Sequence, residues 1–253
     1  MNWHLHFLGV GGGHTVKSGS PAAVLECDGQ PFLLIDCGPD ILDRYQSAYH
    51  SLPRALYITH THMDHVGAME ALFSRLWFDE ARHCTTRLFC HAALVPWLQT
   101  RLADYPGVVA EGGVNYWDAF QLVPCSRGFW LDRWWFDVFA SRHHRPQTSF
   151  GLALAGSFAF TGDTRPIPEV LRHVAGNGEL IAHDCSLHGN PSHSGIDDIE
   201  REYDVSIRKR LLLYHYCHGE DDGTRLTARG YRVAKAGLRI TLLPPLSVRM
   251  DAG

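Results

Sequence analysis

The sequence predicts an α/β (α+β) protein in which two mixed β-sheets are flanked by helices. Two observations support this fold class. Short apolar strands alternate with stretches of helical periodicity in the first half of the chain, and the same alternation returns in the second half. The 253 residues are 45% hydrophobic, which is enough apolar material for a sizeable core. No Pro- or Ser-rich linker separates the halves, so we expect a single domain over residues 1–253.

The first half opens with strands joined by tight turns. An Asp28-Gly29 pair between two apolar runs is typical of a β-hairpin. A further apolar strand leads into a histidine-rich segment, after which apolar side chains recur at the three- or four-residue spacing of a helix. The elements expected here are strands at 3–10, 22–26, 31–35, 55–59 and 87–90, and helices at 66–76 and 92–104.

The middle of the chain, residues 105–135, lacks clear periodicity and is expected to be irregular. Its Trp-rich part, residues 117–135, is expected to pack against the core or at an oligomer contact, and lining a substrate pocket is the alternative. Beyond it the pattern of the first half returns, with Pro168 at the start of a helix. The elements expected here are strands at 136–141, 150–155, 158–161, 180–182 and 211–214, and a helix at 168–175.

Composition narrows the function classes. The net charge of −4 argues against a surface built to hold nucleic acid, because such domains are usually basic. No apolar run approaches the roughly 18 residues of a membrane span, and the N-terminus lacks the charged and apolar regions of a signal peptide. The seven cysteines form no C-x-x-C pair. We therefore expect a reduced, cytoplasmic protein without a membrane segment.

Histidine is unusually frequent, with 17 residues, and the question is whether these side chains form a site. His4 and His6 alternate on the first strand and are expected to be structural. The segment Thr59–His65, THTHMDH, is different, because it places three histidines and one aspartate between a strand and a helix. Alternation brings His60 and His62 to one side, whereas Asp64 and His65 point elsewhere. This arrangement suits two adjacent metal ions better than one.

The same segment resembles the H-x-H-x-D-H motif of the metallo-β-lactamase superfamily without a substitution. The resemblance extends over most of the chain, from FLGVGGG near the N-terminus through LLIDCGP to LLLYHY. It implies a four-layer αββα sandwich. It also implies further ligands at His143 or His144 in SRHHRPQTSFG, at Asp163 in FTGDT and at His215 in LLLYHY.

Two neighbouring histidines compete for the third ligand position. If residues alternate inward along Phe139, Ser141 and His143, then His143 faces the site and His144 faces its surroundings or solvent. We favour His143, with His144 as the alternative ligand.

The resemblance implies a role for each matching residue. Asp163 would bridge two divalent metal ions, which would be zinc or manganese, with iron possible, because the ligand set offers only nitrogen and oxygen. One ion would be held by His60, His62 and His143, and the other by Asp64, His65 and His215.

Within the superfamily, the opening FLG-x-G-x-G and the late histidine resemble ribonuclease Z and its phosphodiesterase relatives. The segments HDCSLHGNPSHSGIDDIE and LLLYHYCHGED are similar to those of the cyclic-phosphate phosphodiesterase of bacterial phosphonate breakdown. That similarity implies a catalytic role for His193. Ribonuclease Z itself fits less well. Its H-E-A-T motif is replaced at His183, and the short interval from His143 to Asp163 leaves no room for a long tRNA-clamping arm.

The sequence thus predicts a metal-dependent hydrolase that cleaves a small or cyclic phosphodiester through a hydroxide activated by the metal pair. Asp64 would orient that hydroxide and His193 would protonate the leaving oxygen. The alternatives are a lactonase or thioesterase on the same centre, and RNA processing like that of ribonuclease Z. The net charge argues against nucleic acid as a partner, and a homodimer stays an open alternative.

Overall fold

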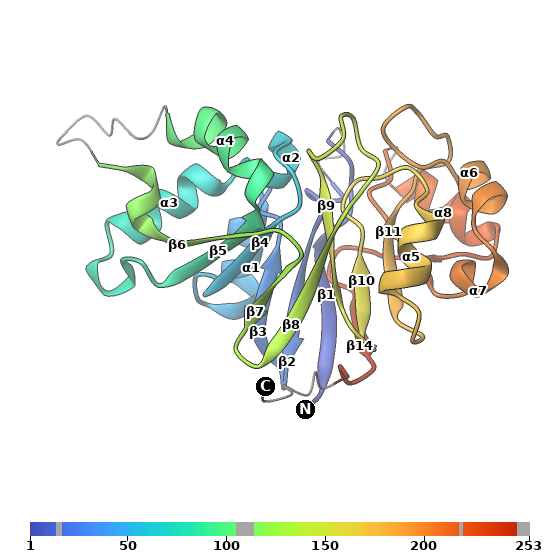
Figure 1. Ribbon diagram of the computed structural model, residues 1–253, viewed down its shortest axis with the longest axis horizontal. Helices are drawn as coiled ribbons and strands as arrows, with labels where there is room; N and C mark the ends of the chain where they lie inside the picture. The colour runs from blue at the N-terminus through green and yellow to red at the C-terminus, as the bar shows by residue number, and fades with distance from the viewer. Residues whose placement is uncertain (14–16, 105–113, 218–219, 247–253) are drawn as a thin grey trace.

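A computed structural model describes residues 1–13, 17–104, 114–217 and 220–246, and it contains two seven-stranded β-sheets flanked by helices (Figure 1). The strand orders are β14-β1-β2-β3-β4-β5-β6 and β13-β12-β11-β10-β9-β8-β7. Each sheet combines parallel and antiparallel pairs, since β3–β4 and β10–β11 are parallel whereas β1–β2 and β8–β9 are antiparallel. The predicted pair of mixed sheets is confirmed.

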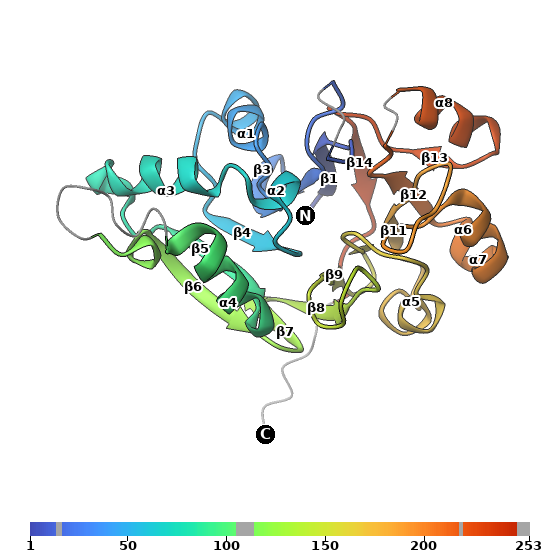
Figure 2. The same cartoon turned by 90° about the horizontal axis from the view of Figure 1, so that it is seen from above.

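Helices of the first half lie beside the first sheet. This sheet lies between the helices α1 and α3 on one side and the second sheet on the other (Figure 2). The strands of this sheet are β1 Trp3–Gly9, β2 Ala22–Cys27, β3 Gln30–Ile35, β4 Ala55–Ile58, β5 Thr86–His91, β6 Phe120–Cys125 and β14 Arg239–Leu242. The helical segments are α1 Ile41–Tyr49, α2 Met63–Val66, α3 Met69–Trp77, η1 Glu80–Arg82, η2 Ala92–Leu94, α4 Val95–Leu98, η3 Gln99–Ala103 and η5 Tyr116–Ala119.

Helices of the second half lie on the opposite side of the molecule, beside the second sheet (Figures 1 and 2). The strands of this sheet are β7 Gly128–Leu131, β8 Trp134–Ala140, β9 Phe150–Leu154, β10 Phe158–Phe160, β11 Leu180–Asp184, β12 Leu211–Tyr214 and β13 Arg232–Val233. The helices are α5 Pro168–Val174, α6 Ile196–Glu202, α7 Val205–Arg208 and α8 Glu220–Ala228. No helix in the described ranges is long and apolar enough to cross a membrane.

The core lies between the two sheets, where aromatic side chains of one sheet contact those of the other. The rings of Phe7 and Tyr214 are 6.0 Å apart, and those of Tyr57 and Phe129 are 5.7 Å apart. All four rings are buried. Aromatic pairs at such separations contribute about 0.5–1.5 kcal/mol beyond the burial of their area. The packed interior therefore holds the strand ends of both sheets in fixed positions.

Polar residues follow the buried strands at one edge of this sandwich. Asp36 follows β3, Thr59 follows β4 and His215 follows β12, while Asp163 lies just beyond β10. Because β3 and β4 are parallel, and β10, β11 and β12 are parallel, their carboxyl ends lie at the same edge of each sheet. This edge carries the candidate site.

The prediction that residues 105–135 are irregular is wrong for the part of this range that the structure describes. Residues 105–113 lie outside the described residues, but β6, β7 and η5 occupy much of the remainder. Both strands are the last in their sheets, and the half-exposed β6 even contains Pro124. Edge strands tolerate proline and need not alternate strictly, so their sequence pattern is weak.

Two predicted helices are interrupted. The helix expected at 66–76 divides into α2 and α3 around Gly67 and Ala68, and the helix expected at 92–104 consists of η2, α4 and η3. The helices α1, α6, α7 and α8 and the strands β13 and β14 had no counterpart in the prediction. Apart from β6 and β7, the remaining strands match the prediction to within two residues at each end.

Candidate metal centre

The segment THTHMDH lies where β4 ends and α2 begins. The chain leaves β4 extended, and His62, in an extended conformation, precedes the first turn of α2. The backbone N–H and the hydroxyl of Thr59 each donate a hydrogen bond of 2.8 Å to the carboxylate of Asp36. Asp36 is fully buried, so it fixes the strand end firmly. The change from extended chain to helix then divides the ligand side chains of this segment between two groups.

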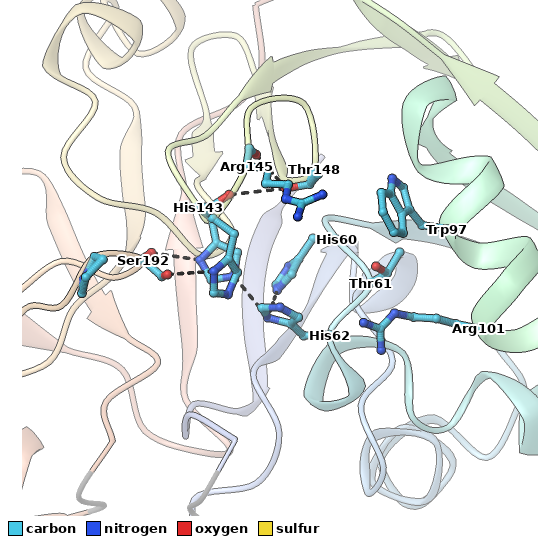
Figure 3. A pocket seen from close by; sticks show the side chains of 11 residues that line it. His60, Thr61, His62, Trp97, Arg101, His143, Arg145, Thr148 and Ser192 are labelled. Atoms are coloured by element: carbon cyan, nitrogen blue, oxygen red, sulfur yellow. Dashed lines mark hydrogen bonds between the residues drawn. The ribbon is translucent and has the colours of Figure 1, made fainter.

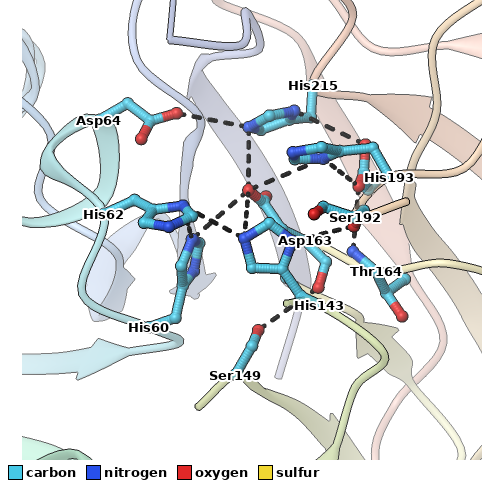
Figure 4. A network of polar contacts seen from close by, with 12 residues as sticks. His60, His62, Asp64, His143, Ser149, Asp163, Thr164, Ser192, His193 and His215 are labelled. Carbon is cyan, nitrogen blue, oxygen red and sulfur yellow. Dashed lines mark hydrogen bonds and ion pairs between the residues drawn. The ribbon is translucent and has the colours of Figure 1, made fainter. Parts of the chain in front are cut away.

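The first group brings together His60, His62, His143 and Asp163 (Figure 4). The Nδ1 atom of His62 lies 3.1 Å from Nε2 of His60 and 3.1 Å from Nε2 of His143. Oδ2 of Asp163 lies 3.4 Å from Nε2 of His60. Four ligands on a tetrahedral zinc ion would lie about 3.3 Å apart, given bonds of about 2.0–2.1 Å. The donor atoms thus have the spacing of a single coordination sphere.

The second group consists of Asp64, His65 and His215, on the other side of Asp163. Nε2 of His215 lies 3.4 Å from Oδ2 of Asp64, and Nε2 of His65 lies 3.6 Å from the same oxygen. Asp163 contacts this group as well, with Oδ1 3.3 Å from His65 and Oδ2 3.2 Å from His215. The carboxylate of Asp163 therefore contacts both groups.

Several donor atoms in this centre lack the partners that buried polar atoms normally have. Nε2 of His65, Nε2 of His215 and Oδ1 of Asp163 are buried, and within the described residues none of them forms a hydrogen bond. Buried polar atoms without a partner are rare in folded proteins, and a bound ion is one arrangement that satisfies them. Three such atoms directed at one another fit a bound cation well. The ligand roles of individual residues stay a prediction.

The protonation states of the first group suit a cation, whereas in the second group Asp163 and Asp64 outweigh burial and raise the pKa of His65 above its ordinary value and that of His215 to about 9. Burial lowers the pKa of His60 well below its ordinary value and that of His143 to about 4, so both rings are neutral. Burial raises the pKa of Asp64, but the neighbouring His65 and His215 outweigh it and bring that pKa down to about 2. Neutral imidazoles and ionised carboxylates are the forms that bind metals.

The structure separates His143 from His144. His143 is buried and its Nδ1–H donates to the carbonyl oxygen of Ser192 at 2.9 Å, which leaves Nε2 free to face the first group. His144 has a positive φ of 49°, is exposed, and pairs with the Ser192 hydroxyl at 2.9 Å. The geometry therefore places His143, and not His144, among the candidate ligands.

Two carboxylates contact Nδ1 atoms of histidines in the centre, and the sequence analysis predicted neither of them. Asp36 lies 2.8 Å from Nδ1 of His65, and Asp184 lies 2.8 Å from Nδ1 of His193 and 3.6 Å from Nδ1 of His215. Such partners fix the ring orientation of metal-binding histidines. Their position at strand ends could have identified them in the sequence, because Asp36 directly follows β3 and Asp184 is the last residue of β11.

His193 lies at the centre, where the sequence placed it. Its ring stacks on that of His215 at 5.0 Å and lies 4.8 Å from that of His143. The backbone N–H of His193 donates to Asn190 Oδ1 at 3.0 Å, which holds the loop. Figure 4 shows the ring between His215 and Ser192, above Asp163. The position allows His193 to reach a substrate bound at the centre.

A pocket of about 610 Å³ opens beside the first group (Figure 3). This volume is typical of small-molecule sites. The alternative role for the Trp-rich segment finds no support here, since Trp117 instead donates to Gln99 and Trp134 packs edge-on against Trp3. A different tryptophan, Trp97, lines the pocket. The full lining is His60, Thr61, His62, Trp97, Arg101, His143, His144, Arg145, Thr148, Pro191 and Ser192.

The profile of the family described as "Anti-Pycsar protein Apyc1" matches residues 3–235, which is most of the chain. The chain belongs to this family. An Anti-Pycsar protein Apyc1 from Paenibacillus harenae is 25% identical over 221 residues, with 84% of this chain and 89% of the relative covered.

Solved structures with a similar fold include the metallo-β-lactamase fold protein YhfI from Bacillus subtilis and the short form of human tRNase Z. The first has a TM-score of 0.73 and 15% identity, with 95% of this chain and 100% of that chain covered. The second has a TM-score of 0.67 and 17% identity, with 95% and 99% covered. The predicted metallo-β-lactamase sandwich and its likeness to the ribonuclease Z branch are thus confirmed.

Proposed function

We propose that this member of the Anti-Pycsar protein Apyc1 family is a metal-dependent phosphodiesterase that hydrolyses a small or cyclic phosphodiester. The observation that carries the proposal is the position of Asp163, whose carboxylate contacts two groups of ligand atoms, while the Asp184–His193 pair lies next to it. The proposal needs two divalent ions, and the unpartnered atoms of His65 and His215 support their binding.

Each residue of the centre has a part in this proposal. His60, His62 and His143 would hold one ion, Asp64, His65 and His215 would hold the other, and Asp163 would be shared between them. All-nitrogen and oxygen ligation suits zinc, manganese or iron. When bound, two such ions lower the pKa of a water molecule and neutralise charge on the phosphate oxygens.

The remaining chemistry falls to side chains of the chain itself. Asp64 is 19% exposed at its side chain, so its carboxylate is open to solvent, and in this proposal it orients the attacking water. His193 donates a proton from Nε2 to the leaving oxygen while Asp184 holds Nδ1. Burial lowers the pKa of His193, but Asp184 and Asp163 outweigh burial and raise it above its ordinary value, which favours the protonated acid.

The size and charge of the site favour a small substrate. Between His143 and Asp163 the chain forms β9 and β10 with their short connections, so this interval contributes no long arm beyond the sandwich. The net charge of −4 disfavours a polyanion such as tRNA. A pocket of about 610 Å³ accommodates one small organic group beside the phosphodiester.

The test combines metal analysis with a substrate screen. Purified protein loaded with zinc or manganese is assayed on bis(p-nitrophenyl) phosphate, on a panel of cyclic phosphodiesters and on a matched panel of lactones and thioesters. We expect two metal ions per chain and turnover of phosphodiesters only. Metal-loaded protein that leaves every phosphodiester intact would overturn the proposal, and turnover of lactones instead would assign the centre to carboxyl esters.

A further inference from the structure

A second pocket, of about 530 Å³, lies at the edge of the second sheet. It is lined by residues of the loop between β1 and β2, of α8 and of the segment after β13, and Figure 2 shows α8 beside β13. Its volume is typical of small-molecule sites, and it shares no lining residue with the pocket beside the first ligand group. We call it the lysine pocket, because Lys17 and Lys235 both line it.

The lysine pocket is positively charged, although the net charge of the chain is −4. Of the 23 lysines and arginines, only three are lysines, and two of these three line the pocket. Both are exposed, and within the described residues neither ammonium group has a carboxylate within 4.0 Å. Among the described residues that line the pocket, none is an aspartate or a glutamate. The charges of Lys17 and Lys235 therefore act together on the interior of the pocket.

A pocket of about 680 Å³ beside the N-terminal ends of β4 and β5 also contains cations, but most of them are already paired. Of its three arginines, Arg82 contacts Asp79 at 2.9 Å and Arg87 contacts Asp132 at 3.2 Å. An anion in that pocket would compete with these carboxylates. An anion in the lysine pocket meets no such competitor among the described residues. The lysine pocket is therefore the stronger candidate for an anion site.

Ser18 adds a hydrogen-bond donor to the lysine pocket. It is only 8% exposed, and its hydroxyl group forms no hydrogen bond within the described part of the chain. A buried hydroxyl without a partner is rare in folded proteins. Such a hydroxyl can donate to an oxygen atom of a bound ligand. Two ammonium groups and a hydroxyl, without a carboxylate beside them, form a set of donors that suits an anion and not a cation.

We infer that the lysine pocket binds the phosphate group of a small phosphomonoester, at a site separate from the metal centre. A phosphomonoester carries a charge of about −1.5 to −2 at neutral pH and offers three strong acceptor oxygens, which match two ammonium groups and one hydroxyl. Lysine binds phosphate well because its ammonium group acts as a point charge. The phosphate lies between Lys17, Ser18 and Lys235, and the remainder of the pocket, towards α8, holds the organic group.

The lysine pocket is adjacent to the metal centre but does not contain its candidate ligands. Val10 lines the pocket, and its carbonyl oxygen accepts a hydrogen bond of 2.7 Å from the backbone N–H of His215. The N–H of Val10 donates to the carbonyl oxygen of Ser18 at 3.0 Å. The imidazole of His215 instead faces Asp64 and Asp163. Because phosphate groups also bind divalent ions, the experiment has to separate binding at the pocket from binding at the centre.

Calorimetry with Asp163→Ala isolates the lysine pocket, because this variant lacks the carboxylate that contacts both ligand groups. Phenyl phosphate is titrated into this variant alone and into the same variant combined with Lys17→Gln, Lys235→Gln or Lys209→Gln. We expect Lys17→Gln and Lys235→Gln each to weaken the Kd by about tenfold, because each removes a charged hydrogen-bond donor. Lys209→Gln is the matched control, since Lys209 is also exposed but does not line the pocket. Equal Kd values in all four proteins would overturn the inference.

Inorganic phosphate, titrated in parallel, shows whether the organic group is recognised. Binding that is weaker than that of phenyl phosphate, with the same dependence on Lys17 and Lys235, supports a site for a phosphomonoester. Binding as tight as that of phenyl phosphate would overturn this part of the inference and assign the pocket to free phosphate.

Pyridoxal 5′-phosphate tests the pocket in the metal-loaded wild type, so that the result does not depend on the folding of a variant. While its phosphate binds one lysine, its aldehyde condenses with the amine of the other and releases water, and borohydride then reduces the imine to a stable amine. We expect mass spectrometry to find the label on Lys17 or Lys235 and not on Lys209, and phenyl phosphate to suppress it. Equal labelling of all three lysines, or the same preference with pyridoxal, which lacks the phosphate, would overturn the inference.

Discussion

Two buried histidine sites in this molecule show opposite patterns of polar contacts. On the first sheet, Nδ1–H of His6 donates to the hydroxyl oxygen of Tyr49 at 2.7 Å, and that hydroxyl donates to Glu26 at 2.6 Å. Arg239 donates to the same Glu26 oxygen at 3.1 Å. We call these four residues the His6 cluster. In the metal centre, by contrast, Nε2 of His65, Nε2 of His215 and Oδ1 of Asp163 form no hydrogen bond among the described residues.

The comparison teaches that the number of histidines does not reveal a site, whereas the direction of their unpartnered atoms does. Burying a polar group without a hydrogen bond costs free energy, so a satisfied cluster is complete in itself. The His6 cluster is complete and is therefore structural. The metal centre, by contrast, contains buried polar atoms without hydrogen-bond partners. These atoms are the reason to expect a bound cation.

The largest expected effect comes from removing Asp163, the residue shared by both ligand groups. Asp163→Ala and His60→Ala should each lower the rate of phosphodiester hydrolysis by at least about a thousandfold, since the ions that supply the chemistry lose a ligand. Metal content by mass spectrometry should fall in parallel, while circular dichroism reports a retained fold. His6→Asn, in the satisfied cluster, is the control and should keep full activity. Comparable losses in His6→Asn would remove the distinction between the two sites.

Metal removal should destabilise the protein. An ion whose free concentration is a thousand times its dissociation constant adds about 4 kcal/mol to the free energy of unfolding. For a chain of this length that corresponds to roughly 8–16 °C in Tm. We expect a chelator to lower Tm of the wild type by this amount in differential scanning calorimetry, and to leave Tm of Asp163→Ala almost unchanged. An unchanged Tm in the chelated wild type would argue against a bound cation.

Asp184 should matter for catalysis without being a ligand in the proposed scheme. Its carboxylate oxygen accepts hydrogen bonds from Nδ1 of His193 at 2.8 Å and from the backbone of Thr164 at 3.0 Å. Asp184→Asn should lower kcat by about 10–100-fold, because His193 loses the charge that orients it and keeps it protonated. KM and metal content should change little. A parallel loss of metal would instead make Asp184 a ligand of the second group.

The sequence identified the side chains that gather at the centre better than the carboxylates that contact them. THTHMDH and the polar residues after β10 and β12 could be recognised because a ligand motif is local, and a buried strand end is visible as an apolar run. Asp36 escaped notice because its partner His65 lies 29 residues away, and only the packing of β3 beside β4 brings them together. Trp97 escaped notice because exposure cannot be read from residue type.

The same reasoning explains the errors in the fold. Central strands such as β12, with every residue buried, give a continuous apolar pattern. The strands β6 and β7 lie at sheet edges, where half of the side chains face solvent and the pattern weakens. Prediction was therefore most accurate where burial was most complete.

The smallest expected effect concerns the His6 cluster. Burial, together with the nearby Arg239 charge, lowers the pKa of His6 below its ordinary value of 6.5, despite the attraction of Glu26. Neutral His6 therefore contributes stability above pH 6.5, and this contribution is lost as the pH falls through the lowered pKa. His6→Asn should cost about 1 kcal/mol at pH 7.5, from one weakened hydrogen bond, or roughly 2–4 °C in Tm.

The difference in Tm between wild type and His6→Asn should then become smaller as the pH is lowered from 7.5 to 5, because only the wild type must protonate a buried imidazole. Subtracting the two Tm values at each pH cancels the titration of every other group, including the metal ligands, which are common to both proteins. A difference that grows at acidic pH would mean that protonated His6 gains more from Glu26 than it loses by burial. The His6 cluster would then be held by an ion pair, and its contrast with the metal centre would be one of charge as well as of partnering.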